Sequence, residues 1–216
     1  GLDALRCKGP GGAVVMEQCL WDALQILRSE IERQQPMVKF LAGRLAAARQ
    51  RLAGQARQPR PGAPRVEAIY ELAARDGKEI PKELQLAPGT STTLRAELGR
   101  VLNHFNKASG GSILVCAADL LGSTSVNVIA QGFPAGYFHT STNPESRTLS
   151  VGGICEDAMA GVCSGLGAYG HHIGVASSYA AFIAPLGHIA ARLHAIGNQA
   201  RTSTFGGTYR PMVLVG

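Results

Sequence analysis

The sequence of 216 residues lacks several features that define large classes of protein. No stretch approaches the ~20 uninterrupted apolar residues that a transmembrane helix needs. The first residues, GLDALRCKGPGG, contain no basic segment followed by an apolar one, which is the pattern of a secretion signal. We therefore expect a soluble, cytoplasmic protein with no membrane partner. The 45% hydrophobic and 17% charged residues are typical of a globular fold.

Signatures of disulfide frameworks and of zinc sites are also missing. The five cysteines are an odd number, are scattered and form no C-x-x-C motif, and no histidine lies at zinc-ligand spacing from them. Cys116 and Cys163 lie in apolar runs, where a free cysteine behaves as a small hydrophobic residue. We expect a reducing compartment, no disulfides and no metal site in this chain.

Acidic residues are absent from one segment of the chain. Residues 37–65 contain seven Lys or Arg and no Asp or Glu, whereas residues 101–216 contain five basic and four acidic residues. The net charge of +6 therefore comes from this segment. Such a segment could bind phosphates, but few aromatic side chains that could stack on bases accompany the charges. A solvated helix face is therefore favoured over nucleic-acid binding.

The N-terminal part of the chain has helical periodicity. Apolar residues at helical spacing predict helices over residues 16–35 and 38–52, with Pro36 stopping or kinking the first. We expect these two helices to pair as a helical hairpin. The stretch GQARQPRPGAPR, residues 54–65, is rich in Pro and Arg and predicts a flexible linker.

The composition changes near residue 90, after a short predicted helix at 66–75. We therefore divide the chain into a helical linker region, residues 1–89, and an α/β domain, residues 90–216. In the second part, predicted helices alternate with short apolar strands, which favours a three-layer helix/parallel sheet/helix fold. The expected order is helix 92–107, strand 112–118, strand 147–153, helix 155–166, strand 172–178, helix 179–197 and strand 211–216.

Ligands of open parallel sheets bind at the carboxyl ends of the strands. Asp119, Ser123, residues 153–156 and residues 177–179 follow predicted strands and are therefore the candidate positions. The remaining serines, together with His172, His188 and His194, are expected to be structural.

The run GLGAYG, residues 165–170, matches the dinucleotide-binding pattern G-x-G-x-x-G. That pattern needs a strand before the glycines and a helix after them, so that the helix N-terminus meets the pyrophosphate. Here the predicted order is reversed. Gly167 and Gly170 are therefore expected to end a helix and to turn the chain.

Glu156 has two interpretations that spacing alone leaves open. It could be a solvated acid in the first turn of a helix, where the helix dipole favours negative charge. It could also be a carboxylate in a mostly apolar pocket formed by Ile154, Leu120 and the ring of Tyr179 or Phe182. Asp157, its neighbour, fits the first interpretation well.

Five segments together carry a resemblance to a known family: TLRAELGRVL, CAADLLGST, GGICEDAM, GLGAYG and SSYAAFIAPLGHIAARLHA. Their order and spacing resemble the pyrimidine-binding domain of transketolase and its thiamine-diphosphate-dependent relatives, over about residues 92–216. The family signature runs G-I-x-E-x-x-M, then a Gly-rich turn, then two aromatic residues. The resemblance implies a three-layer α/β thiamine-diphosphate-binding fold of the pyrimidine type.

The resemblance also implies a role for Glu156. In the family, the matching acid hydrogen-bonds the N1′ nitrogen of the aminopyrimidine of the cofactor. This contact lets the 4′ nitrogen remove the proton from C2 of the thiazolium, which makes the nucleophile. Thiamine diphosphate is therefore the expected cofactor, and Glu156 the residue that activates it.

The remaining site residues follow from the same resemblance. Those expected at the cofactor are Leu120, Ile154, Tyr179, Phe182 and Asp119, with the two aromatic rings packed against the pyrimidine and the apolar side chains holding the cofactor bent. Arg95 and Ser123 match positions that contact a sugar phosphate in transketolases. Pro185 stands where the family has a third aromatic residue, so one wall of the pocket differs.

The family's diphosphate-binding motif, G-D-G followed by an Asn, is absent from the sequence. The resemblance therefore implies that magnesium or calcium and the diphosphate are bound by a missing domain, in a homodimer or a partner subunit. We expect this chain to be truncated at its C-terminal end and to be inactive alone. The segment around residues 145–147 is expected to be mobile, because its family counterpart lies against partner surfaces.

The expected reaction is transfer of a two-carbon ketol unit between sugar phosphates. A related enzyme that acts on 2-oxo acids, such as a deoxyxylulose-phosphate synthase or a 2-oxoacid dehydrogenase E1 component, is the alternative within the family. An alternative of another class is a noncatalytic scaffold or binding module that uses the basic helical region to hold a partner.

Overall fold

The computed structural model describes residues 12–56, 58–76, 80–199 and 209–216. The chain divides into two compact units, Gly1–Pro59 and Arg60–Gly216. The division falls inside the Pro/Arg-rich stretch 54–65. Arg65 at the end of that stretch belongs to the second unit, where its backbone N–H donates to the Ser109 carbonyl at 2.8 Å.

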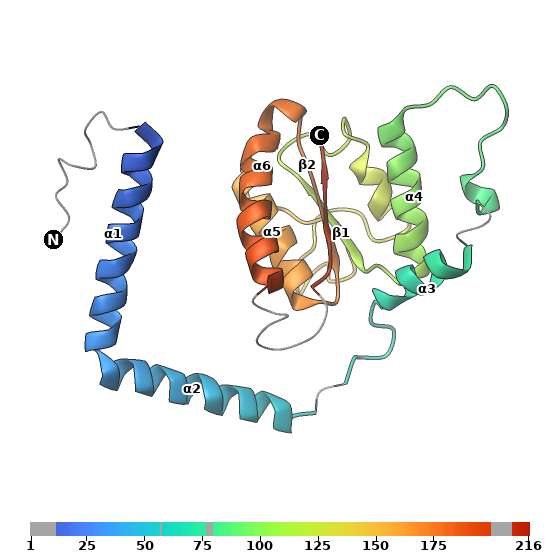
Figure 1. The fold of residues 1–216 in the computed structure, drawn as a ribbon. Helices are drawn as coiled ribbons and strands as arrows, with labels where there is room; N and C mark the ends of the chain where they lie inside the picture. The colour runs from blue at the N-terminus through green and yellow to red at the C-terminus, as the bar shows by residue number, and fades with distance from the viewer. Residues whose placement is uncertain (1–11, 57, 77–79, 200–208) are drawn as a thin grey trace. The chain divides into compact units, whose positions relative to one another are not determined.

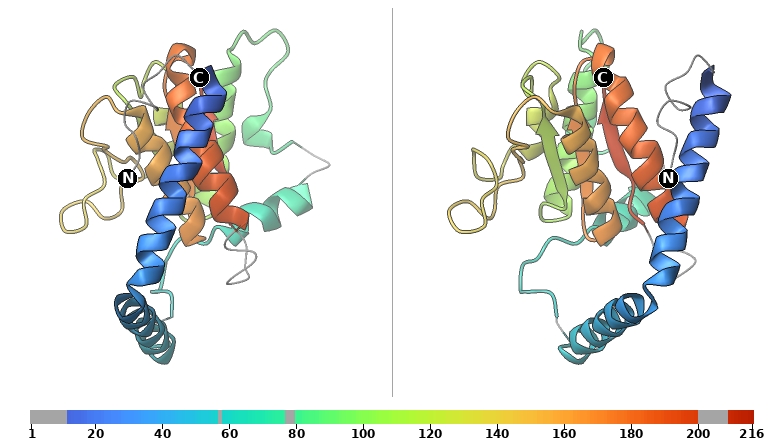
Figure 2. Two further views of the ribbon diagram at one scale, coloured as in Figure 1. Left: turned by 60° about the vertical axis from the view of Figure 1, so that its left-hand side comes forward. Right: turned by 90° about the vertical axis from the view of Figure 1, so that its left-hand side faces the viewer.

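The first unit consists of two helices, α1 (Gly12–Arg33) and α2 (Gln35–Gly54). Pro36 lies in the first turn of α2, where its missing N–H would have no partner in any case, so it begins this helix. The helices meet at an angle at Gln34 and do not fold back on each other (Figures 1 and 2). The expected helical hairpin is therefore wrong, because one intervening residue is too short for the reversal.

Cys19 on α1 is disulfide-bonded, so the expectation of a chain without disulfides is also wrong. Spacing did not reveal this bond, because connectivity cannot be deduced from scattered cysteines. Among the described helices, none combines the length and the apolar character needed to cross a membrane.

The second unit is built on a parallel sheet of three strands in the order β1-β2-β3. These strands are β1 (Ile113–Ala117), β2 (Ile173–Ser177) and β3 (Met212–Val215). Val115 pairs with Val175, which in turn pairs with Val213. All three strands were predicted, because strands covered on both faces are apolar throughout.

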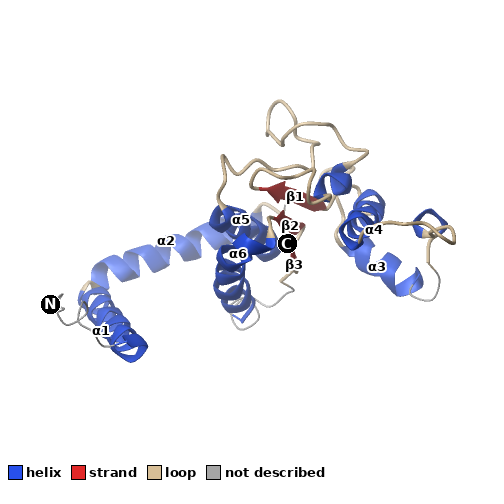
Figure 3. Cartoon of the chain, turned by 90° about the horizontal axis from the view of Figure 1, so that it is seen from above, coloured by secondary structure: helices blue, strands red, loops and turns tan. Residues whose placement is uncertain are grey.

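Helices cover both faces of this sheet, as the view from above shows (Figure 3). One face packs against α3 (Glu67–Asp76), α4 (Leu94–Ala108) and the 3-10 helix η3 (Val126–Ala130). The other face packs against α5 (Glu156–Tyr169) and α6 (Ile183–Ile189). The three-layer α/β/α arrangement is therefore confirmed. Val115 and Met159, both 0% exposed, lie in the two cores.

Two predicted elements differ from the structure. Residues 147–153 form no regular strand and pair with β1 only at the isolated bridge between Thr148 and Val115. The predicted helix 179–197 is divided into the 3-10 helix η4 (Ala180–Phe182), the α-helix α6 and the π-helix Ala190–Ala195.

Arg147 fastens the segment that was expected to be mobile. Its side chain is 6% exposed and pairs with Glu145 at 3.1 Å. The guanidinium carbon lies 4.9 Å from the centre of the Phe133 ring. Gly111, with φ of +96°, lets Arg147 approach its backbone, since a Cβ there would lie 2.0 Å from Nε. These contacts restrain the segment around residues 145–147 and so count against the expected mobility.

Glycines set the length and the position of α5. Gly170, with φ of +89°, ends the helix and donates its N–H to the Leu166 carbonyl at 3.2 Å, as predicted. Gly167 lies inside the helix instead of ending it, and its carbonyl accepts the Arg210 N–H at 3.0 Å. Gly174 on β2 lets α5 pack closely, because a Cβ would lie 2.6 Å from Cys163 Cα.

Candidate functional site

The carboxyl ends of β1 and β2 and the N-terminus of α5 lie at one edge of the sheet. Glu156 is the first residue of α5, and Ser178 directly follows β2. The Ser178 hydroxyl donates to Glu156 Oε1 at 2.9 Å. Ser178 is only 5% exposed, and its backbone N–H donates to the Val215 carbonyl at 3.0 Å. A buried residue that is anchored to the sheet therefore orients the Glu156 carboxylate.

The local sequence explains how Glu156 reaches this edge. Gly152 and Gly153 have positive φ values of 82° and 155°, which turn the chain before the helix. Cys155 occupies the N-cap position and makes no side-chain capping bond. Acids in the first turn are favoured next to the unpaired N–H groups.

The two neighbouring acids differ in their surroundings. Asp157 is exposed, whereas Glu156 is half-buried and bonded to Ser178. The solvated interpretation therefore fits Asp157. The Glu156 carboxylate is instead held in place by its hydrogen bond to Ser178. Among the described residues, no group hydrogen-bonds to Oε2 of Glu156, so this oxygen can accept a hydrogen bond from a ligand.

Ser177, the residue before Ser178, carries a second buried polar atom, although strand alternation points its side chain to the other face of the sheet. The hydroxyl of Ser177, the last residue of β2, is buried and has no hydrogen-bond partner among the described residues. Burying a hydroxyl without a hydrogen-bond partner destabilises the fold, because the group loses the hydrogen bonds that it makes to water. The Ser177 hydroxyl is therefore a candidate for binding a ligand or a water molecule.

Apolar side chains also follow the carboxyl ends of β1 and β2 or precede Glu156 in the sequence. Ile154 is 70% exposed, Tyr179 45% and Phe182 51%. Leu120, which follows β1, is half-buried. Three of these four residues expected at the cofactor therefore expose a large part of their apolar side chains to solvent.

The remaining candidate residues are solvent-exposed. Asp119 follows β1, Ser123 lies in the turn after it, and Arg95 is in the first turn of α4. Figure 1 shows that α4 begins at the end of the unit where β3 ends. Within the described structure, none of the three forms a hydrogen bond or an ion pair with Glu156.

Sequence reasoning placed Ser178 among the candidate positions at the strand ends, within residues 177–179, but gave it no role. Its hydrogen bond joins residues that are 22 positions apart. No spacing rule signals such a bond, because it depends on the alignment of α5 with β2. The one available signal was the position of Ser178 directly after a buried strand.

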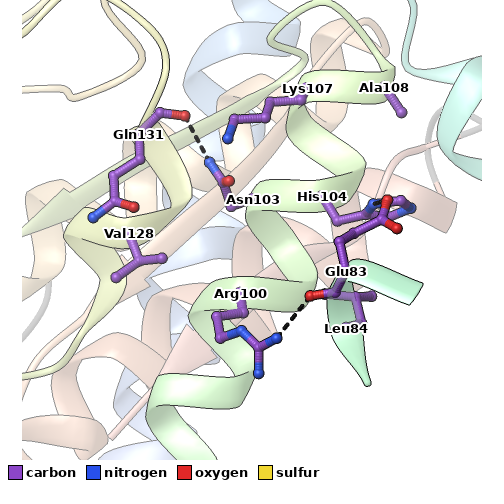
Figure 4. Close-up of a pocket in the computed structure, with 9 residues that line it drawn as sticks. All are labelled: Glu83, Leu84, Arg100, Asn103, His104, Lys107, Ala108, Val128 and Gln131. Atoms are coloured by element: carbon purple, nitrogen blue, oxygen red, sulfur yellow. Dashed lines mark hydrogen bonds and ion pairs between the residues drawn. The ribbon is translucent and has the colours of Figure 1, made fainter. Parts of the chain in front are cut away.

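A pocket of about 530 Å³ opens elsewhere on this unit, beside α4 (Figure 4). Arg100, His104 and Lys107 line it from successive turns of the helix. His104 Nδ1 lies 2.9 Å from Glu83 Oε1, and the Arg100 guanidinium donates to the Glu83 carbonyl at 2.7 Å. The Asn103 amide donates to the Gln131 carbonyl at 2.8 Å.

The polar groups of this pocket are therefore largely used to fasten neighbouring segments to α4. None of the residues expected at the cofactor or substrate lines the pocket. We interpret this pocket as a gap between packed segments and not as a ligand site.

The Cys163 thiol and the His172 imidazole are titratable groups that we do not assign to the site. Hydrogen bonding to Cys116, with Sγ atoms 3.8 Å apart, and burial raise the pKa of the Cys163 thiol, so it is not a nucleophile. Burial, with contributions from Arg147 and His171, lowers the pKa of His172. Among the described residues, no group of three or more His, Cys, Asp or Glu could hold a metal ion.

Comparison with protein-family models found no match. Comparisons with curated proteins and with solved structures also found no match. The site is therefore interpreted from its own geometry.

Proposed function

We propose that this chain is the pyrimidine-binding part of a transketolase-like enzyme, which transfers a two-carbon ketol unit between sugar phosphates with thiamine diphosphate. The observation that carries the proposal is Glu156, a half-buried carboxylate at the carboxyl edge of a parallel sheet, oriented by Ser178. In this proposal Glu156 holds a proton shared with the ring nitrogen of the aminopyrimidine. Thiamine diphosphate would supply the carbanion-stabilising chemistry when bound.

The residues at this edge fit an aminopyrimidine. Ser178 uses one Glu156 oxygen and leaves the other for a ring N–H. Tyr179 and Phe182 present partly exposed aromatic faces that can pack on a flat ring, and Leu120 and Ile154 add apolar surface.

The described residues fit the diphosphate end less well, because they include no metal-binding cluster. We propose that magnesium or calcium and the diphosphate are held by a diphosphate-binding domain, in a homodimer or in a partner subunit. Such a domain would also cover the exposed apolar residues around Glu156 and so exclude water from the site.

Arg95 and Ser123 are the proposed contacts to the sugar phosphate. Both are exposed, so they are free to meet a substrate that enters between domains. If Arg95→Ala in the assembled enzyme leaves KM for phosphorylated sugars unchanged, the related enzymes that act on 2-oxo acids become the better assignment. A binding module remains the candidate of another class, because α2 exposes four cationic residues and contains no acidic residue.

The test is Glu156→Gln in the enzyme assembled with its diphosphate-binding region, with Asp157→Asn as the matched control. Both variants remove one negative charge from the first turn of α5. We expect Glu156→Gln to slow the exchange of the C2 proton of thiamine diphosphate, followed by NMR, by about 10²–10⁴-fold. Asp157→Asn should leave exchange unchanged, because its carboxylate is solvated.

A normal exchange rate in the Glu156→Gln variant would show that Glu156 is only a helix-start acid. The unassembled chain, supplied with sugar phosphates, cofactor and magnesium, should show no turnover. Turnover by the pure chain would contradict the need for a second region.

A further inference from the structure

Helices α1 and α2 each expose an apolar stripe along their length. On α1 the stripe is formed by residues spaced four, three and four apart, and their side chains are 44–59% exposed: Leu20, Leu24, Leu27 and Ile31. On α2 the spacing is three, four, three and four, and the three leucines are 57–63% exposed: Val38, Leu41, Leu45, Ala48 and Leu52. This alternation is typical of helices that pack side by side.

Nothing in the described part of this unit covers the stripes. Between residues 12 and 59, no described residue is buried. In proteins, most of the stability of a helix comes from burying its apolar face against another surface. Each stripe therefore needs a partner surface.

The two helices cannot cover each other within one chain. An antiparallel helical hairpin needs a connection of about two to five residues, and here only Gln34 separates α1 from α2. The helices meet end to end at an angle instead (Figure 1). A partner for each stripe must therefore come from outside this pair of helices.

Charge identifies that partner. Helix α1 has four acidic and two basic residues, so its net charge is 2 − 4 = −2, whereas α2 has four basic residues and no acid, a net charge of +4. Arg44 and Arg51 directly precede stripe residues of α2, where they flank the seam. Pairing α2 with a second α2 would bring like charges together, which is destabilising, whereas α1 is complementary to α2.

The lengths of the helices agree with this pairing. Helix α1 has 22 residues and α2 has 20. At ~1.5 Å per residue, the two helices can therefore lie side by side along nearly their whole length.

We infer that the first unit is a dimerisation element in which α1 of one chain packs against α2 of a second copy, and α2 against α1. The two contacts are equivalent under a two-fold axis, so the interface closes on itself. Each of the two helix pairs then buries two stripes, one from each copy. This inference does not depend on the proposed function, because it uses no residue of the Glu156 site.

The test uses a charge swap in the full chain. One variant reverses α2 (Lys39→Glu, Arg44→Glu and Arg51→Glu), and the other reverses α1 (Glu17→Lys, Asp22→Lys and Glu30→Lys). The wild-type chain should sediment as a dimer. Each variant alone should dimerise at least about a hundredfold more weakly, because like charges then face each other across the interface. An equimolar mixture should recover the dimer, since each variant supplies the charge that the other lacks.

A second pair of variants tests the apolar seam. Leu45→Ser should weaken dimerisation, whereas Phe40→Ser should not, because Phe40 is 70% exposed but lies off the stripe. Circular dichroism checks that the helices persist in each variant.

A wild-type chain that is monomeric at every concentration would overturn the inference, and so would a mixture that fails to recover the dimer. Binding of the monomer to anionic vesicles, lost in the α2 reversal, would reassign the basic face to a membrane surface. Binding of the monomer to DNA or RNA, lost in the α2 reversal, would show instead that the basic face of α2 binds nucleic acid.

Discussion

Asn106 joins three elements of the α/β unit through one buried side chain. It lies in the last turn of α4 and is 0% exposed. Its Nδ2 donates to the carbonyls of Ile113 and Ile129, both at 3.0 Å, and its Oδ1 accepts the Ile113 N–H at 2.7 Å. The side chain therefore fixes the start of β1 and the end of η3 relative to α4.

The perturbation is Asn106→Ala, which removes all three hydrogen bonds. At ~1 kcal/mol net for each of the three bonds, with a further penalty of ~1–3 kcal/mol for a buried backbone group left unpaired, we expect a loss of about 4–6 kcal/mol. That is a large part of the 5–15 kcal/mol that is typical of folded domains. The loss should shift the urea midpoint without changing the slope.

The assay is urea unfolding followed by far-UV circular dichroism, because the single tryptophan, Trp21, lies in the first unit. Lys107→Ala, an exposed neighbour on α4, is the control and should change stability by less than about 0.5 kcal/mol. Asn106→Asp keeps the acceptor for the Ile113 N–H but loses both donors, so it should be as destabilising as Ala at neutral pH. A loss below about 1 kcal/mol for Asn106→Ala would refute the reasoning, because three buried bonds should cost more than that.

Two further predictions concern packing and pH. Gly174→Ala should destabilise the fold by about 1–3 kcal/mol in the same assay, because the added Cβ meets Cys163 Cα at 2.6 Å. Gly161→Ala on α5, where nothing lies within 4 Å, should instead stabilise it by ~0.5–1 kcal/mol, and equal effects would contradict the close packing. Since the pKa of folded His172 is lowered from 6.5, the unfolded chain binds more protons, and stability should fall as pH drops through 6.5 towards the folded pKa. His172→Phe should reduce this pH dependence, whereas His139→Asn, at an exposed position, should not; an unchanged dependence in the His172 variant would exclude His172 as its source.

The strands and the covering helices were predictable, because parallel strands and amphipathic helices have distinct apolar patterns. The segment around Thr148 was not, because an apolar run does not show how much of it will pair. The division of residues 179–197 into three helical types was also not signalled, since apolar spacing does not distinguish 3-10, α and π turns. The angle between α1 and α2 depended on a single residue, Gln34, which periodicity ignores.

For the site, the position of Glu156 at the start of a helix could be predicted from the sequence. Its bond to Ser178 could not, because that bond depends on tertiary alignment. The exposure of Tyr179 and Phe182 was also beyond sequence reasoning, since an aromatic pair at this spacing is equally typical of a core. Arg147 shows the same limit, because a lone arginine after a loop gives no sign that it will be buried.

Ser178 connects β3 to α5 through two hydrogen bonds. Its backbone N–H is bonded to the end of β3, and its hydroxyl is bonded to the first residue of α5. The Glu156 carboxylate is therefore tied to the last strand as well as to its own helix, and a displacement of β3 would be transmitted to it through one side chain. Slow hydrogen exchange of the Ser178 amide would then report that Glu156 is held in place.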